Sequence, residues 1–97
     1  MHKYLKDHVK EEIEGAIDYL EKAIELKKTN PEWAAKFFKM SDMEIEHANC
    51  MTKMFNSAEK PDDVTAVEFS AMQKELIDAY TSSMSKIEGM KKLYWNA

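Results

Sequence analysis

The sequence predicts an all-α protein in which two antiparallel helices pair with a third long helix. Only two Gly and two Pro interrupt the chain, and 33% of its residues are charged beside 44% that are hydrophobic, which is typical of helical proteins. Apolar residues recur every three or four positions, and prolines mark the breaks between these periodic stretches. At 97 residues the chain is long enough for one domain, expected over residues 1–97. The expected helices span about residues 4–28, 31–58 and 62–94.

The first expected helix, residues 4–28, has a continuous apolar face and a clear end. Its end is marked by the sequence Thr29-Asn30-Pro31, which favours a turn over a helix. The apolar face is formed by Leu5, Val9, Ile13, Ala16, Ile17, Leu20 and Ile24.

The second expected helix, residues 31–58, begins with three favourable residues. Asn30 is a good N-cap, Pro31 suits the first helical position, and Glu32 places a negative charge in the first turn. Because its connection to the first helix is short, we expect an antiparallel helical hairpin. Its apolar stripe comprises Trp33, Phe37, Met40, Ser41, Ala48, Met51 and Phe55.

The third expected helix, residues 62–94, follows a break at residues 60–63. It starts at Asp62, or at Thr65 if Glu68 completes a capping box with it. Its apolar stripe contains neither Glu nor His, so this helix is expected to pack rather than to bind metal. The stripe comprises Phe69, Met72, Leu76, Tyr80, Ile87, Met90 and Tyr94.

Net charge and composition indicate which partners the protein is not expected to bind and which cellular compartment it fits. A net charge of −4 argues against nucleic acid or an anionic membrane surface as a partner. No apolar run approaches the roughly 20 residues of a membrane span, and no signal peptide is visible. The single cysteine, Cys50, excludes an internal disulfide and fits a reducing compartment, so a cytoplasmic location is expected. Cys50 projects away from Glu44, which favours a plain thiol over a redox role.

The pair Glu44-x-x-His47 is the strongest candidate for a functional site. Residues three apart on a helix share a face, so one carboxylate and one imidazole can reach the same metal ion. Glu44 projects close to the centre of the apolar stripe, with His47 on its flank. A carboxylate in that position loses its hydration, which costs several kcal/mol unless it is paired or bound to metal.

A partner for Glu44 is expected on the first helix, where three glutamates compete. Glu11 projects opposite the apolar face and Glu14 lies well off it, whereas Glu12 lies on its edge. We therefore select Glu12. His8, one turn earlier, could be a further ligand, although a His near a helix start is more often solvated.

The expected ligand set per chain, Glu12, Glu44 and His47, is half of a known pattern. Di-metal sites in bundle cores use a Glu from each of two helices and a Glu-x-x-His from each of two others. Two copies of this chain would supply the whole set, which predicts a homodimer forming a four-helix bundle and leaves a higher homo-oligomer open. Carboxylates with imidazole suit iron or manganese and also accept zinc. The alternative is a metal-free protein in which Glu44 pairs with a lysine or hydrogen-bonds to Ser41 or Tyr19.

The first two helices also resemble the metal-binding helices of the ferritin-like superfamily. The first helix of that superfamily carries a Glu, a small residue three positions on and an aromatic residue seven positions on, matched by Glu12, Gly15 and Tyr19. Its second metal-binding helix carries Glu-x-x-His-Ala, matched by Glu44, His47 and Ala48. The similarity covers about residues 5–58 and is greatest to encapsulated ferritin and small ferritin-like proteins of bacteria and prophages, with rubrerythrin more distant.

This resemblance implies a ferritin-like hairpin and an iron centre with two ions per dimer, formed between two subunits. Glu44 would bridge the metals, Glu12 and His47 would be terminal ligands, and Tyr19 would lie beside the site as a hydrogen-bond donor or radical source. The implied activity is ferroxidase chemistry, in which Fe(II) is oxidised by O₂ or peroxide. The resemblance also implies that acidic neighbours feed metal to the site, matched by Glu11 and Glu14.

Two departures from the resembling proteins keep a second function open. Residues 91–97 lack the short peptide that targets cargo to an encapsulin shell, so that partner stays open, and the chain lacks the paired Cys-x-x-Cys motifs of a rubredoxin domain. The alternative function is a non-catalytic helical oligomerisation or adaptor protein, of a kind that phages encode, with a structural metal or none.

Overall fold

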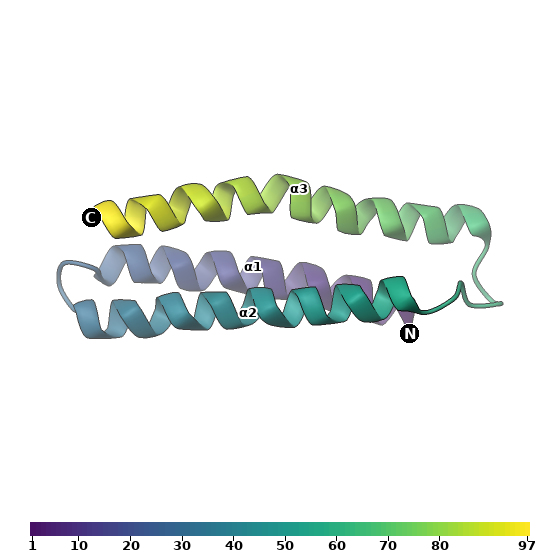
Figure 1. Cartoon of the computed structure of the whole chain (residues 1–97), viewed down its shortest axis with the longest axis horizontal. Coiled ribbons are helices and arrows are strands. Elements are labelled where there is room, and N and C mark those ends of the chain that lie inside the picture. The colour runs from purple at the N-terminus through teal and green to yellow at the C-terminus, as the bar shows by residue number, and fades with distance from the viewer.

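The computed structural model describes residues 1–97 and contains three α-helices and no strands. They are α1 (His2–Leu26), α2 (Pro31–Ser57) and α3 (Ala66–Asn96). Figure 1 shows α1 and α2 lying antiparallel, with α3 running along the pair for its whole length. The fold class is therefore all-α, as predicted. None of the three helices has both the length and the hydropathy that crossing a membrane requires.

The hairpin of α1 and α2 forms through the predicted cap. The Trp33 backbone N–H donates to Asn30 Oδ1 over 3.2 Å, and Pro31 occupies the first position of α2. Helix α1 begins at His2, two residues before the predicted start, because the His2 ring is buried against Phe55 and Phe69 at centroid distances of 4.8 and 5.2 Å. This contact keeps the first turn of α1 packed. Helix α1 then ends two residues earlier than predicted and α2 one residue earlier.

Helix α3 begins at Ala66, at the later of its two predicted starts. Thr65 is the N-cap: its hydroxyl accepts from the Glu68 N–H over 3.1 Å and donates to the Glu68 carboxylate over 3.0 Å. The start at Asp62 is wrong, because residues 62 and 63 lie in a turn that precedes this capping box. At the other end α3 continues to Asn96, two residues beyond the predicted end.

Helix α3 covers one face of the hairpin and packs mainly against α1. The buried contacts continue along the length of the three helices, and ion pairs join α3 to the hairpin. Lys6 pairs with Glu75 over 3.0 Å, and Lys91 pairs with Asp42 over 2.7 Å. The buried apolar residues are Leu5, Val9, Ile13, Ala16, Leu20, Ala23, Ala34, Ala48, Phe55, Leu76, Ile87, Met90 and Tyr94.

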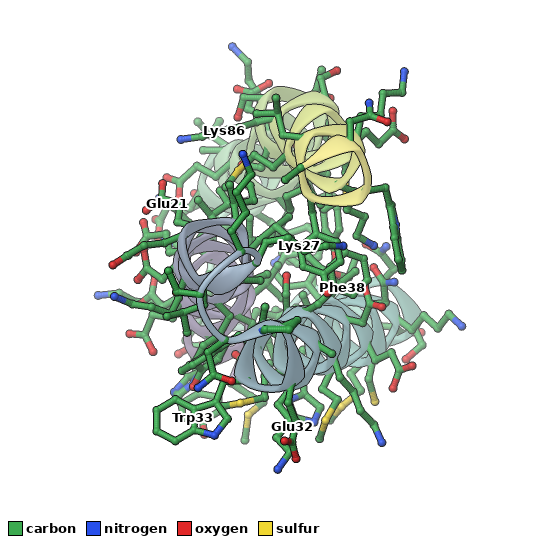
Figure 2. All side chains as sticks on the ribbon, turned by 90° about the vertical axis from the view of Figure 1, so that its left-hand side faces the viewer. Glu21, Lys27, Glu32, Trp33, Phe38 and Lys86 are labelled. Carbon is green, nitrogen blue, oxygen red and sulfur yellow. The ribbon has the colours of Figure 1, made fainter.

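Helix α2 has two apolar faces, of which only one is buried. The buried face comprises Ala34, Ser41, Ala48 and Phe55. The second face is exposed, with 57% of Trp33, 38% of Met40, 45% of Met43 and 51% of Met54 accessible, and it is called the open face below. Figure 2 shows Trp33 pointing away from α3, whereas Phe38 lies between α2 and α3.

Because α2 has two apolar faces rather than one, Glu44 does not lie at the centre of a buried stripe as predicted. The helical wheel counted both apolar faces as one stripe and placed Glu44 near its centre. In the structure Glu44 is half-buried, between the buried face of α2 and its open face. Its carboxylate is therefore partly desolvated and lies next to a surface that nothing in one chain covers.

Candidate metal centre

Glu12 from α1 and Glu44 and His47 from α2 lie together in the middle of the hairpin. One ligand atom from each residue lies within 4.8 Å of the other two. Glu12 and Glu44 are half-buried and His47 is exposed, with its Nδ1 at 3.7 Å from Glu12 Oε2. The three residues selected from the sequence are therefore brought to one place, and α3 contributes nothing to this group.

A buried hydrogen bond sets the register that brings these residues together. The Ser41 hydroxyl donates to the Ala16 carbonyl oxygen over 2.7 Å, across the α1–α2 contact. Glu44 follows Ser41 by one turn, so this register places it opposite Gly15 and Glu12. The Ser41 hydroxyl proton is therefore donated to Ala16 and not to Glu44, which is the hydrogen bond that the metal-free alternative expected.

Gly15 lets the Glu44 carboxylate lie directly against the backbone of α1. A Cβ atom at position 15 would stand 3.2 Å from Glu44 Oε2 and 3.7 Å from its Cδ. These distances are at or inside ordinary van der Waals contact, so a side chain here would compete with the carboxylate for space. Helical spacing does not predict this close approach. A glycine inside a long helix is a signal for it, because glycine costs about 1 kcal/mol relative to alanine there.

The Glu12 carboxylate perturbs the carboxylate of Glu44. The pKa of Glu44 is raised from 4.5 to about 7, first by a hydrogen bond with Glu12, then by burial and by the negative charge of Glu12. His47 acts in the opposite direction and lowers it. Two adjacent carboxylates that share one proton behave in this way, because both cannot ionise cheaply at short range. A cation at the same place could take over the role of the shared proton.

The donor set fits a divalent metal ion. Glu12 Oε2 is buried, and no N–H group and no serine, threonine or tyrosine hydroxyl of the chain donates a hydrogen bond to it. No lysine forms an ion pair with either Glu12 or Glu44, so the positive partner that the metal-free alternative requires is not supplied by a lysine. Two carboxylates and an imidazole suit iron, manganese or zinc. A buried oxygen with no donor and two facing carboxylates are best satisfied by such an ion.

Tyr19 does not belong to this group of ligand atoms. It is half-buried, and its ring lies 6.1 Å from the ring of Phe37 in a tilted arrangement. No hydrogen bond links Tyr19 to Glu12 or Glu44, so the hydrogen bond proposed in the metal-free alternative is not formed.

The other candidate residues lie outside this group of ligand atoms. His8 Nδ1 lies 3.7 Å from Glu11 Oε2, and the His8 ring packs 4.1 Å from the ring of Tyr4. Glu11 and Glu14 are exposed, as their positions on the helical wheel predict, and Cys50 is exposed on α2.

The family model described as Rubrerythrin matches residues 3–97. No curated protein and no solved structure matches the chain. The match confirms the resemblance to the ferritin-like superfamily. The matching family is rubrerythrin, which the sequence motifs resemble more distantly than encapsulated ferritin. The particular likeness to encapsulated ferritin stays a prediction. The match extends beyond the hairpin to include α3, and the chain therefore belongs to the rubrerythrin family of the ferritin-like superfamily.

Proposed function

We propose that this protein binds iron at Glu12, Glu44 and His47 and oxidises Fe(II) in a centre formed between two copies of the chain. The observation that carries the proposal is the convergence of three metal-ligand atoms within 4.8 Å around a buried carboxylate oxygen that has no hydrogen-bond donor. Membership of the rubrerythrin family supports iron over the other ions that these donors accept.

The number of donors supports a shared centre. One chain offers two carboxylates and one imidazole, whereas di-iron centres in helix bundles use four carboxylates and two imidazoles. A second copy related by a two-fold axis supplies the missing half. The open face, with Trp33, Met40, Met43 and Met54, lies on the side of α2 that also carries His47, and it would be covered in such a dimer.

In this proposal Fe(II) is the substrate and the chain's residues hold it. Two Fe(II) ions each give one electron to O₂, which with two protons leaves as hydrogen peroxide, or to hydrogen peroxide, which with two protons leaves as two water molecules. Glu44 would bridge the two ions, and Glu12 and His47 would be the terminal ligands that each chain supplies. The negative carboxylates favour the more highly charged Fe(III) product, and loading the site displaces the proton shared by Glu12 and Glu44. Tyr19, seven residues after Glu12 and so on the same face of α1, is proposed to serve as a hydrogen-bond donor or radical source, and the protein is proposed to work in the cytoplasm.

A second candidate is a helical oligomerisation or adaptor protein with a structural metal. The exposed apolar residues of the open face favour it, because they suit any stable helix contact whether or not chemistry follows. The two candidates differ in redox behaviour. A structural site accepts zinc and iron alike without turnover, whereas a ferroxidase centre develops Fe(III) absorbance that depends on oxygen.

The decisive experiment compares Glu44→Ala with Glu46→Ala, an exposed glutamate two residues away on the same helix. Metal-free protein is loaded with Fe(II) without oxygen, desalted, analysed for iron, and then exposed to air while Fe(III) absorbance is recorded. Wild type and Glu46→Ala should retain iron and oxidise it, and Glu44→Ala should do neither. If Glu44→Ala retains as much iron as wild type, the site is elsewhere. If wild type retains iron but shows no oxygen-dependent Fe(III) absorbance, the ferroxidase proposal is wrong and the metal is structural.

A further inference from the structure

The chain has two glycines, and both lie inside helices, where glycine is unfavourable. Gly15 is in the middle of α1 and Gly89 is in α3. Glycine loses more backbone freedom on folding than alanine does, so each position weakens its helix. The surroundings of the two glycines differ. A Cβ at Gly89 would meet nothing within 4 Å, whereas the three nearest atoms to a Cβ at Gly15 all belong to Glu44.

These three atoms define what a side chain at position 15 would disturb. They are Glu44 Oε2 at 3.2 Å, Cδ at 3.7 Å and Cγ at 3.8 Å. The tightest contact is with the carboxylate oxygen, which is the free end of a flexible side chain. In the metal-free chain this oxygen can move by a few tenths of an ångström at little cost. The helix should therefore gain stability from alanine here, as it should at position 89.

We propose that Gly15 is a positioning residue for the metal centre, which keeps the Glu44 carboxylate in the one place where it meets Glu12 and His47. The inference rests on the proposed metal site. A metal bound to all three residues fixes the carboxylate, so the contact with an added methyl group can no longer be relieved by movement. The cost of a side chain at position 15 thus arises in the metal-bound form alone.

The test compares Gly15→Ala with the matched control Gly89→Ala. Without metal, both variants should melt about 4 °C higher than wild type. Mn²⁺ is the probe, because it takes the same donors without being oxidised in the assay. By calorimetry at matched protein concentration, Mn²⁺ affinity should fall about tenfold to a hundredfold in Gly15→Ala and stay unchanged in Gly89→Ala.

A rescue variant separates positioning from helix packing. In Glu44→Asp the carboxylate is one methylene shorter and withdraws from α1, so adding Gly15→Ala should cost little or no further Mn²⁺ affinity. If glycine is needed for close approach of a second chain instead, the loss persists in the Asp background and overturns the proposal. Equal Mn²⁺ affinity of wild type and Gly15→Ala overturns the role of Gly15 alone. Absence of Mn²⁺ binding by wild type overturns the metal site and this role together.

Discussion

At the scale of single residues, the neighbouring glutamates of α1 should behave very differently. Glu12 points into the donor group and Glu11 is exposed and paired with His8. We expect Glu12→Ala to slow Fe(II) oxidation by orders of magnitude, because each ion would lose a charged oxygen donor. Glu11→Ala should oxidise Fe(II) at a rate close to that of wild type. Stopped-flow absorbance at matched protein concentration measures both rates, and an active Glu12→Ala would contradict the assigned ligand set.

The raised pKa of Glu44 predicts how metal binding depends on pH. The carboxylate must lose its proton before it can bind metal, and its pKa is about 7 because of the hydrogen bond with Glu12, burial and the charge of Glu12. Mn²⁺ affinity should therefore fall as the pH drops from about 8 to 6. The profile should be measured by calorimetry, with Glu46→Ala as the control. An affinity that stays constant over this range would show that the proton is not displaced.

The same pKa predicts the opposite trend for the stability of the metal-free protein. The folded chain keeps the Glu44 proton up to about pH 7, while the unfolded chain releases it near the ordinary pKa of 4.5. The stability contributed by this group is present below 4.5 and is lost as pH rises towards 7. Glu44→Gln, which carries no titrating proton, should show a smaller decrease in melting temperature between pH 5 and 7.5 than wild type. An identical decrease in both proteins would rule out Glu44 as its source.

The site residues could be chosen from the sequence because helical spacing alone decides which groups share a face. Glu12 is separated from Glu11 and Glu14 by its angle on the wheel, and His47 follows Glu44 by one turn. The contact of Gly15 with Glu44 joins two helices, so it depends on their register and separation, which spacing within one helix does not give. The burial of His2 was missed for the same reason, since Phe55 and Phe69 belong to other helices.

At the scale of helices, the register of the hairpin should depend on Ser41. Its hydroxyl makes a buried hydrogen bond to α1, and Ser41→Ala removes it without leaving a large cavity. We expect the free energy of unfolding to fall by about 1 kcal/mol, with weaker Mn²⁺ binding because the register is held less firmly. Urea unfolding and calorimetry measure the two effects. Ser70→Ala, at an exposed position in α3, is the control and should change neither.

The helices themselves were predictable where local chemistry decides them. Asn30 and Pro31 place the start of α2, and the Thr65–Glu68 capping box places the start of α3. The amount of burial was not predictable, since Met40 and Met51 recur at the same spacing although Met40 is exposed and Met51 is half-buried. Periodicity reports which residues share a face, and only the packing of α1 and α3 decides which part of that face is covered.

At the scale of the whole molecule, the open face of α2 should be the contact between two copies. Wild type should sediment as a dimer at micromolar concentration, with the dimer strengthened by Fe(II) or Mn²⁺. Met43→Glu places a charge on that face and should shift the population to monomer. The control is Leu93→Glu, on an exposed position of α3, which should stay dimeric. A wild type that is monomeric with and without metal would contradict the shared centre.

The placement of α3 on one side of the hairpin has a consequence for growth of the assembly. A contact between identical chains through one two-fold face uses the same surface on both partners, so it saturates when the pair forms. Because α3 covers the other side along its whole length, the hairpin offers no second copy of that surface to a third chain. If two copies pair through the open face, association through that face therefore stops at two chains. Pairing of this kind would cover the exposed methionines and Trp33 of the open face without open-ended polymerisation through that face.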